Sequence, residues 1–132
     1  MLTHRITSGW SRGSENIVRS FDLSAGAENN IDETIPAGAN NLAVAFALDV
    51  SQLKALFMLS DKDVTVETNS GAAPINTFAL KAGVPFVWNT NDASLRDTAG
   101  TAVATDVTGL FLTNAGASDA LLQIRALLDP TI

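Results

Sequence analysis

The sequence predicts an all-β protein made of a single β-sandwich domain, most simply a jelly roll, behind a short N-terminal arm. Three observations support this fold class. Large apolar residues recur at every second position, short runs of this kind alternate with turns rich in Gly, Asn, Asp and Ser, and no long stretch has helical periodicity. We count about eight or nine short strands in 132 residues, which is typical of a sandwich with antiparallel strands.

The segment Asn40–Ser60 has the strongest pattern and is expected to form the centre of the domain. Its large apolar residues alternate with alanines and Asp49, as in a strand with one large apolar face: Leu42, Val44, Phe46, Leu48 and Val50. The alanines leave a helix as an alternative, but the spacing of two favours a buried strand. A second apolar run, Ala55–Leu59, is apolar on both sides, which predicts a strand covered on both faces.

Residues Met1–Glu15 form the expected arm, because they contain Trp10 among small and polar residues without sustained periodicity. The sandwich domain is then expected to span residues 16–132. Its first strand is Asn16–Leu23, with Ile17, Phe21 and Leu23 on one face, and a weaker strand, Asn29–Pro36, should end at an edge or in a turn. A further strand with one exposed face is expected at Val64–Thr68.

The second half of the chain continues the same alternation. Two runs, Ile75–Leu80 and Val84–Trp88, flank a Lys-Ala-Gly turn and predict a hairpin. The polar segment Asn89–Thr105 predicts a long surface loop, and Thr108–Thr113 returns to a strand pattern. The final run, Ala120–Leu128, fits either a strand or a helix, and the Gly-containing turn before it favours a strand.

Composition and charge exclude several classes of function. The formal net charge is −6, and the few basic residues are scattered, which argues against binding nucleic acid or an anionic membrane. The chain has no cysteine, so disulfides and thiolate chemistry are excluded. No apolar run has the length of a signal peptide or a membrane span, so we expect a soluble protein made without Sec export.

Few residues suggest chemistry. The single histidine, His4, has no histidine partner, and we expect an ordinary exposed side chain. Two carboxylates of a turn, Asp61 and Asp63, could hold a hard cation together with Glu67, but the loop lacks the central glycine of a calcium loop. Trp88 is expected to cap the core beside a phenylalanine, with sugar stacking as the alternative. Three carboxylates bracket the long loop and are the candidates for a small hydrolase: Asp92, Asp97 and Asp106. We therefore expect no enzyme activity and no cofactor.

Three segments resemble the small jelly-roll cement, or decoration, proteins of tailed bacteriophages. These segments are FDLSAGAENNIDETIPAGANNLAVAF, TNSGAAPINTFALKAGVPFVWN and DVTGLFLTNAGASDALLQIRALL, so the resemblance covers nearly the whole domain from Asn16 onward. The motifs are turn and strand patterns without a catalytic signature. The acidic charge, the absence of cysteine and the short arm agree with the same family.

The resemblance implies a structural virion protein that is made in the host cytoplasm and binds the exterior of the capsid. Its partner would be the major capsid protein, whose neighbouring subunits it would bridge and stabilise, usually as a homo-oligomer such as a dimer or trimer. Two alternatives from other classes stay open. One is a binding protein, either a carbohydrate-binding sandwich module or another virion or tail adhesion component. The other is a small hydrolase.

The residues expected to contact the capsid or a neighbouring subunit lie in the arm and in the long loop. Trp and Arg are enriched at interface anchors, and these segments have no evident core partner. The candidates are Arg5, Trp10, Arg12, Leu95 and Arg96. Phe57 and Met58 point to opposite sides of one strand, which also favours a homo-oligomer, because so small a domain cannot cover both faces.

Overall fold

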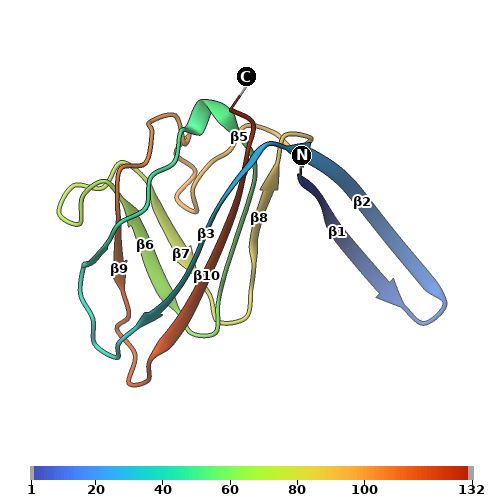
Figure 1. The fold of residues 1–132 in the computed structure, drawn as a ribbon. Helices are drawn as coiled ribbons and strands as arrows, with labels where there is room; N and C mark the ends of the chain where they lie inside the picture. Colours follow the sequence, from blue (N-terminus) through green and yellow to red (C-terminus); the bar gives the residue numbers. More distant parts are fainter. Residues whose placement is uncertain (1, 131–132) are drawn as a thin grey trace.

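The structure, a computed structural model, describes residues 2–130 and contains two sandwiched sheets and a projecting hairpin (Figure 1). The described residues form ten strands and one short 3-10 helix, Val50–Gln52. The strands are β1 (Leu2–Arg12), β2 (Glu15–Ala25), β3 (Ala27–Ile35), β4 (Leu42–Val44), β5 (Leu53–Ser60), β6 (Val64–Thr68), β7 (Thr77–Leu80), β8 (Phe86–Asn89), β9 (Leu110–Thr113) and β10 (Ala120–Leu128).

The sandwich has the strand order of a jelly roll. One four-stranded sheet has the order β3-β10-β5-β8, and the other has the order β4-β9-β6-β7. The first four strands pair antiparallel with the last four in reverse sequence: β3 with β10, β4 with β9, β5 with β8 and β6 with β7. This is the pairing that results when one long antiparallel ribbon is rolled into two facing sheets. The predicted all-β sandwich is confirmed.

The core lies between the two sheets and takes one face of each strand. Its least exposed large side chains come from both sheets, with Ile35, Leu122 and Ile124 on one side and Val66 and Leu112 on the other. The strand β10 alternates buried and more exposed residues over most of its length, so LLQIRALL is a strand, and the strand predicted at Ala120–Leu128 is confirmed. Among the side chains that the structure describes, none from the hairpin belongs to this core.

The central stretch keeps its predicted faces but not its predicted length. Phe46 and Leu48 are buried while Ala45 and Ala47 are exposed, which confirms the alternation. The strand ends at Val44, however, because the chain here crosses from the sheet of β4 to that of β5. Leu48 retains an isolated bridge to Val107, and the side chain of Asp49 caps the 3-10 helix that precedes β5.

The predicted hairpin of residues 75–88 is wrong. Strands β7 and β8 flank the predicted turn, but they belong to different sheets and do not pair with each other. The turn contains Gly83 with φ of 72°, and the Val84 N–H donates to the carbonyl of Lys81 at 3.0 Å. A local turn signal cannot distinguish a hairpin from a crossing between two sheets, because both require the same reversal of chain direction.

The predicted boundary between arm and sandwich also differs from the structure. Residues 2–12 are an extended strand that pairs along its whole length with β2. The predicted first sandwich strand, Asn16–Leu23, therefore belongs entirely to the hairpin, and the sandwich begins at β3 after a bend at Gly26. Within residues 2–130, no helix is long or apolar enough to cross a membrane.

Candidate docking surface

The β1–β2 hairpin is held together by a tight turn and a regular register. Arg12 lies opposite Glu15, so two residues connect the strands. Gly13 is the first of them and has φ of 58°, the left-handed value that a type II′ hairpin turn requires at this position. Since side chains of a strand alternate between its two sides, this register gives the hairpin one polar and one apolar face.

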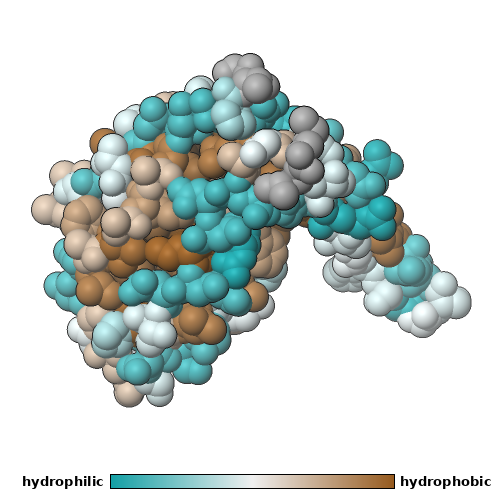
Figure 2. Space-filling view, viewed as in Figure 1, coloured by the Kyte–Doolittle hydropathy of each residue, from teal (hydrophilic) through white to brown (hydrophobic). Residues whose placement is uncertain are grey.

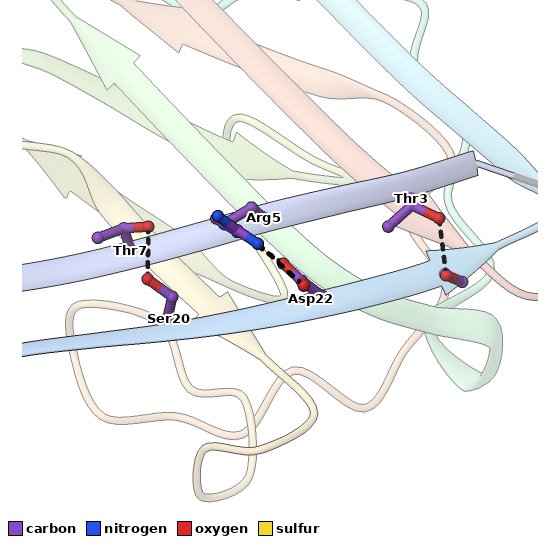
Figure 3. A network of polar contacts seen from close by, with 6 residues as sticks. Thr3, Arg5, Thr7, Ser20 and Asp22 are labelled. Carbon is purple, nitrogen blue, oxygen red and sulfur yellow. Dashed lines mark hydrogen bonds and ion pairs between the residues drawn. The ribbon is translucent and has the colours of Figure 1, made fainter.

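The polar face carries a ladder of side-chain pairs (Figure 3). The hydroxyls of Thr3 and Ser24 are 2.9 Å apart, as are those of Thr7 and Ser20. Between them, the guanidinium of Arg5 donates to both carboxylate oxygens of Asp22, at 2.8 and 3.2 Å. Hydrogen bonding from Arg5 holds the pKa of Asp22 below its ordinary value. These contacts fix the pairing of the two strands.

The apolar face contacts the sandwich only near the base of the hairpin. Here Leu23 and Ala25 of β2 are buried against Ala55 of β5 and Leu127 of β10, and Ile6 packs on the same cluster. His4, also on this face, is hydrogen-bonded through Nε2 to a carboxylate oxygen of Glu28 of β3. These contacts attach the hairpin to the outer surface of the sheet β3-β10-β5-β8, which is the surface that faces away from the core.

Toward its tip, the hairpin leaves the sandwich and its apolar face becomes exposed. Trp10 and Ile17 lie directly opposite each other and are 67% and 62% exposed. Arg19 of the same face lies over the ring of Phe21, with 5.3 Å between the guanidinium carbon and the ring centre. The outer part of the hairpin projects away from the sandwich (Figures 1 and 2).

A cleft of about 380 Å³ opens where the hairpin diverges from the sheet. The hairpin contributes Ile6 to its wall, and the sheet contributes Phe57 and Leu127. Polar or charged side chains also line the cleft, namely His4, Arg5, Glu28 and Arg125. Arg125 is paired with Asp32 at 2.9 Å on the outer surface of the sheet. The cleft has an apolar wall and a polar margin, as protein–protein interfaces have.

The structure separates the five predicted contact residues. Arg5, Trp10 and Arg12 are all exposed on the hairpin, with Arg5 on the polar face and the other two on the apolar face. Leu95 is only 7% exposed and belongs to the core, so it cannot contact a partner as predicted. Its neighbour Arg96 is exposed, and its guanidinium donates to the carbonyl of Gly100 at 2.8 Å.

The loop carboxylates accept hydrogen bonds that organise the backbone. Asp97 is buried and accepts hydrogen bonds from the Asn76 side chain and the backbone N–H groups of Thr77, Ala99 and Thr101, at 2.9 to 3.0 Å. Burial alone would raise the pKa of Asp97, but these hydrogen bonds outweigh burial and lower it. The other two carboxylates accept from different backbone groups, Asp92 from the Asn89 N–H and Asp106 from the Val50 N–H.

The other candidate sites are also occupied by contacts within the chain. The Asp61 carboxylate accepts from the Leu121 N–H at 2.8 Å, and Asp63 accepts from the Ala82 N–H at 2.8 Å. In residues 2–130, no three His, Asp or Glu side chains are grouped so that they could hold a metal ion. Trp88 packs against the core, and its indole N–H donates to the carbonyl of Ala93 at 2.8 Å. Its side chain is half-buried.

Comparison with known proteins identifies no family. No family model matches the chain, and no curated protein matches it. One solved structure is similar, from the work "Bacillus endospore appendages form a novel family of disulfide-linked pili". Its sequence is 14% identical, the match covers 81% of this chain and 96% of that chain, and the TM-score is 0.30. A similarity at this level carries no argument about fold or function.

Sequence reasoning missed the hairpin partner of the predicted arm. The signal was present, because His4, Ile6, Ser8 and Trp10 alternate with more polar or smaller residues up to a Gly-Ser turn. Two buried asparagines, Asn76 and Asn114, were also missed. The Asn114 side chain donates to the carbonyls of Ile35 and Ser118 and accepts from the Gly116 N–H, so it holds the turn between β9 and β10.

Proposed function

We propose that the protein is a structural cement, or decoration, protein of a phage capsid, which binds the outside of the shell of major capsid protein and bridges neighbouring subunits. The observation that carries this proposal is the projecting hairpin with an unpartnered apolar face. Leaving Trp10 and Ile17 in water, 67% and 62% exposed, forgoes the stabilisation that their burial would supply. A partner that covers this face supplies that stabilisation on binding.

The rest of the chain supports a binding role more than a catalytic one. The jelly roll is compact and well packed, and the carboxylates of its long loop are engaged by the backbone. A cement protein needs a rigid body and a repeated contact, because many modest contacts on a symmetric shell add through multivalency. A stiff hairpin on a rigid sandwich meets both needs: it reaches beyond the footprint of the body and presents a defined face.

A carbohydrate-binding module is the second candidate, and one observation favours it. Trp10 is an exposed aromatic side chain, as a sugar-stacking platform requires. Binding in a glycan array that is lost in Trp10→Ala but retained in Ile17→Ala would favour this second function, because sugar stacking needs the indole ring and not its aliphatic neighbour.

Co-sedimentation with capsids tests the proposed function. The assay uses assembled capsids that lack the protein, from the phage whose genome encodes the chain. The intact protein should sediment with them, whereas Trp10→Ser and Ile17→Ser should each weaken binding about 10-fold or more, as loss of an interface anchor does. The matched control is Val18→Ser, because Val18 is 53% exposed but lies opposite Gly9 on the polar face. Absence of any capsid binding by the intact protein would contradict the proposal.

A further inference from the structure

Two apolar surfaces of this chain have the same character and are both left partly uncovered. One is the tip of the hairpin's apolar face, with Trp10 and Ile17. The other is the outer surface of the sheet β3-β10-β5-β8, where Phe57 of β5 lies directly opposite Val87 of β8. Their neighbours in each strand, Met58 and Trp88, point into the core, so Phe57 and Val87 point outward. Phe57 is half-buried, and Val87 is 38% exposed.

The chain itself shows that these two surfaces fit each other. At the hairpin base, Ile6 and Leu23 of the apolar face pack on Ala55 and Leu127 of the outer sheet surface. On the hairpin, Trp10 lies beyond Ile6 on the same face of β1, and Ile17 lies opposite Trp10. On the sheet, Phe57 is the next residue after Ala55 on the outer face of β5. The exposed parts are thus extensions of a contact that already exists within one copy.

The exposed parts do not meet within the same copy. The hairpin diverges from the sheet (Figure 1). The cleft of about 380 Å³ has Ile6 of the hairpin and Phe57 of the sheet in its lining. Beyond the cleft, the tip lies away from the sandwich, with Trp10 and Ile17 among the most exposed apolar side chains of the described residues. Contact between the tip and an outer sheet surface therefore requires a second molecule.

Charge also favours a second copy of this chain as the occupant. Residues 1–25 carry three arginines and two carboxylates, a net charge of +1, while residues 26–132 carry five basic and twelve acidic residues, a net charge of −7. Two arginines, Arg12 and Arg19, lie on the apolar face of the hairpin, and Glu28 lines the cleft. The basic hairpin of one copy and the acidic sandwich of another attract each other because their electrostatic potentials are complementary. Two acidic sandwich domains without hairpins would repel each other.

We propose that the apolar tip of the hairpin docks on the outer surface of the sheet β3-β10-β5-β8 in a second copy, beside its cleft. This inference rests on the docking role of the hairpin in the proposed function, but it does not require a capsid. A reciprocal exchange around a two-fold axis places the tip of each copy on the sheet of the other copy, so that the two contacts are identical. The contact anchors are Trp10 and Ile17 on the hairpin and Phe57 and Val87 on the sheet.

The mass in solution provides the first test. By light scattering and sedimentation, the intact protein should be dimeric at tens of micromolar. Trp10→Ser and Phe57→Ser should each weaken association about 10-fold or more. Substitutions of two exposed valines serve as controls and should leave association unchanged. One is Val18→Ser on the polar face of the hairpin, and the other is Val84→Ser in the turn between β7 and β8, which lies beside the end of β5 that is farther from the hairpin base. A monomeric intact protein at these concentrations overturns the inference.

Disulfide crosslinking between different copies provides the second test, because the chain has no cysteine of its own. Trp10→Cys and Phe57→Cys are prepared as separate proteins, mixed and oxidised. We expect a crosslinked heterodimer in this mixture and at least 10-fold less in the mixture of Trp10→Cys with Val84→Cys. Equal crosslinking in the two mixtures would mean that the tip has no preferred docking site, which overturns the inference.

The two proposals fail in distinguishable ways. Capsid binding by a protein that is monomeric and does not crosslink through Phe57→Cys would contradict the exchange between copies but retain the cement function. A crosslinked dimer that does not sediment with capsids would contradict the cement function but retain the exchange.

Discussion

Trp10 and Ile17 face each other across the β1–β2 hairpin, and both side chains lie in solvent. Cross-strand pairs of an aromatic and a β-branched residue stabilise a hairpin, but an isolated two-stranded ribbon is marginally stable in water. In this protein the base of the hairpin packs on the sheet, and hydrogen bonds between side chains of the polar face join its two strands (Figure 3). The hairpin is thereby kept extended while its apolar tip stays available for a partner.

Removal of the hairpin should leave the sandwich folded. The core between the sheets includes no described side chain of the hairpin, and the hairpin contacts the sandwich through the hydrogen bond of His4 with Glu28 and through its own small cluster with Ala55 and Leu127. A chain of residues 26–132 should keep the β-type circular dichroism and a cooperative urea transition, at somewhat lower stability because those two side chains become exposed. Loss of the cooperative transition would show that the hairpin is part of the folding unit.

Phe46 tests the register of the central segment. Its side chain is 7% exposed in the core, so Phe46→Ala should lower the free energy of unfolding by about 3–5 kcal/mol, as measured by urea melts. Val84→Ala, at a site 58% exposed, should change it by less than about 0.5 kcal/mol. A loss below about 1 kcal/mol in Phe46→Ala would place this side chain outside the core.

Asp97 gives the stability a defined dependence on pH. Its folded-state pKa is lowered, so its contribution is complete above the ordinary aspartate pKa and is lost as the pH falls through the folded-state value. Asp97→Asn should destabilise the protein by about 2–3 kcal/mol at pH 7, because several donors lose a charged acceptor, and by less in acid. The control Glu15→Gln, at the exposed hairpin turn, should have little effect at either pH. A constant difference between wild type and Asp97→Asn from pH 7 to strong acid would contradict this account.

Period-2 alternation was sufficient to predict the fold class. The buried positions of the central stretch, the last strand at Ala120–Leu128 and the strand Val64–Thr68 follow directly from it, because each has one face committed to the core. The same signal does not encode which strands pair. Strands β7 and β8 look like a hairpin in sequence but diverge into two sheets, since pairing depends on contacts between distant parts of the chain.

The docking surface was predictable only in part. Trp10 is unusual in a polar segment, and composition alone marked it as an anchor. Leu95 misled the prediction because it lies in a polar loop, yet its side chain turns into the core and leaves Arg96 outside. The partner side of the surface, Phe57 with Val87, was not identified as a pair because the two strands are far apart in sequence and meet only through the jelly-roll pairing.

The fluorescence of Trp10 tests the central claim, that a partner covers the apolar face of the hairpin, most directly. In Trp88→Phe, Trp10 is the remaining tryptophan of the chain, and its exposed indole should emit as in water when the protein is dilute. Raising the protein concentration, or adding capsids to dilute protein, should move the emission to shorter wavelength and reduce quenching by iodide. Emission and quenching that stay those of an exposed indole in both experiments would contradict the claim.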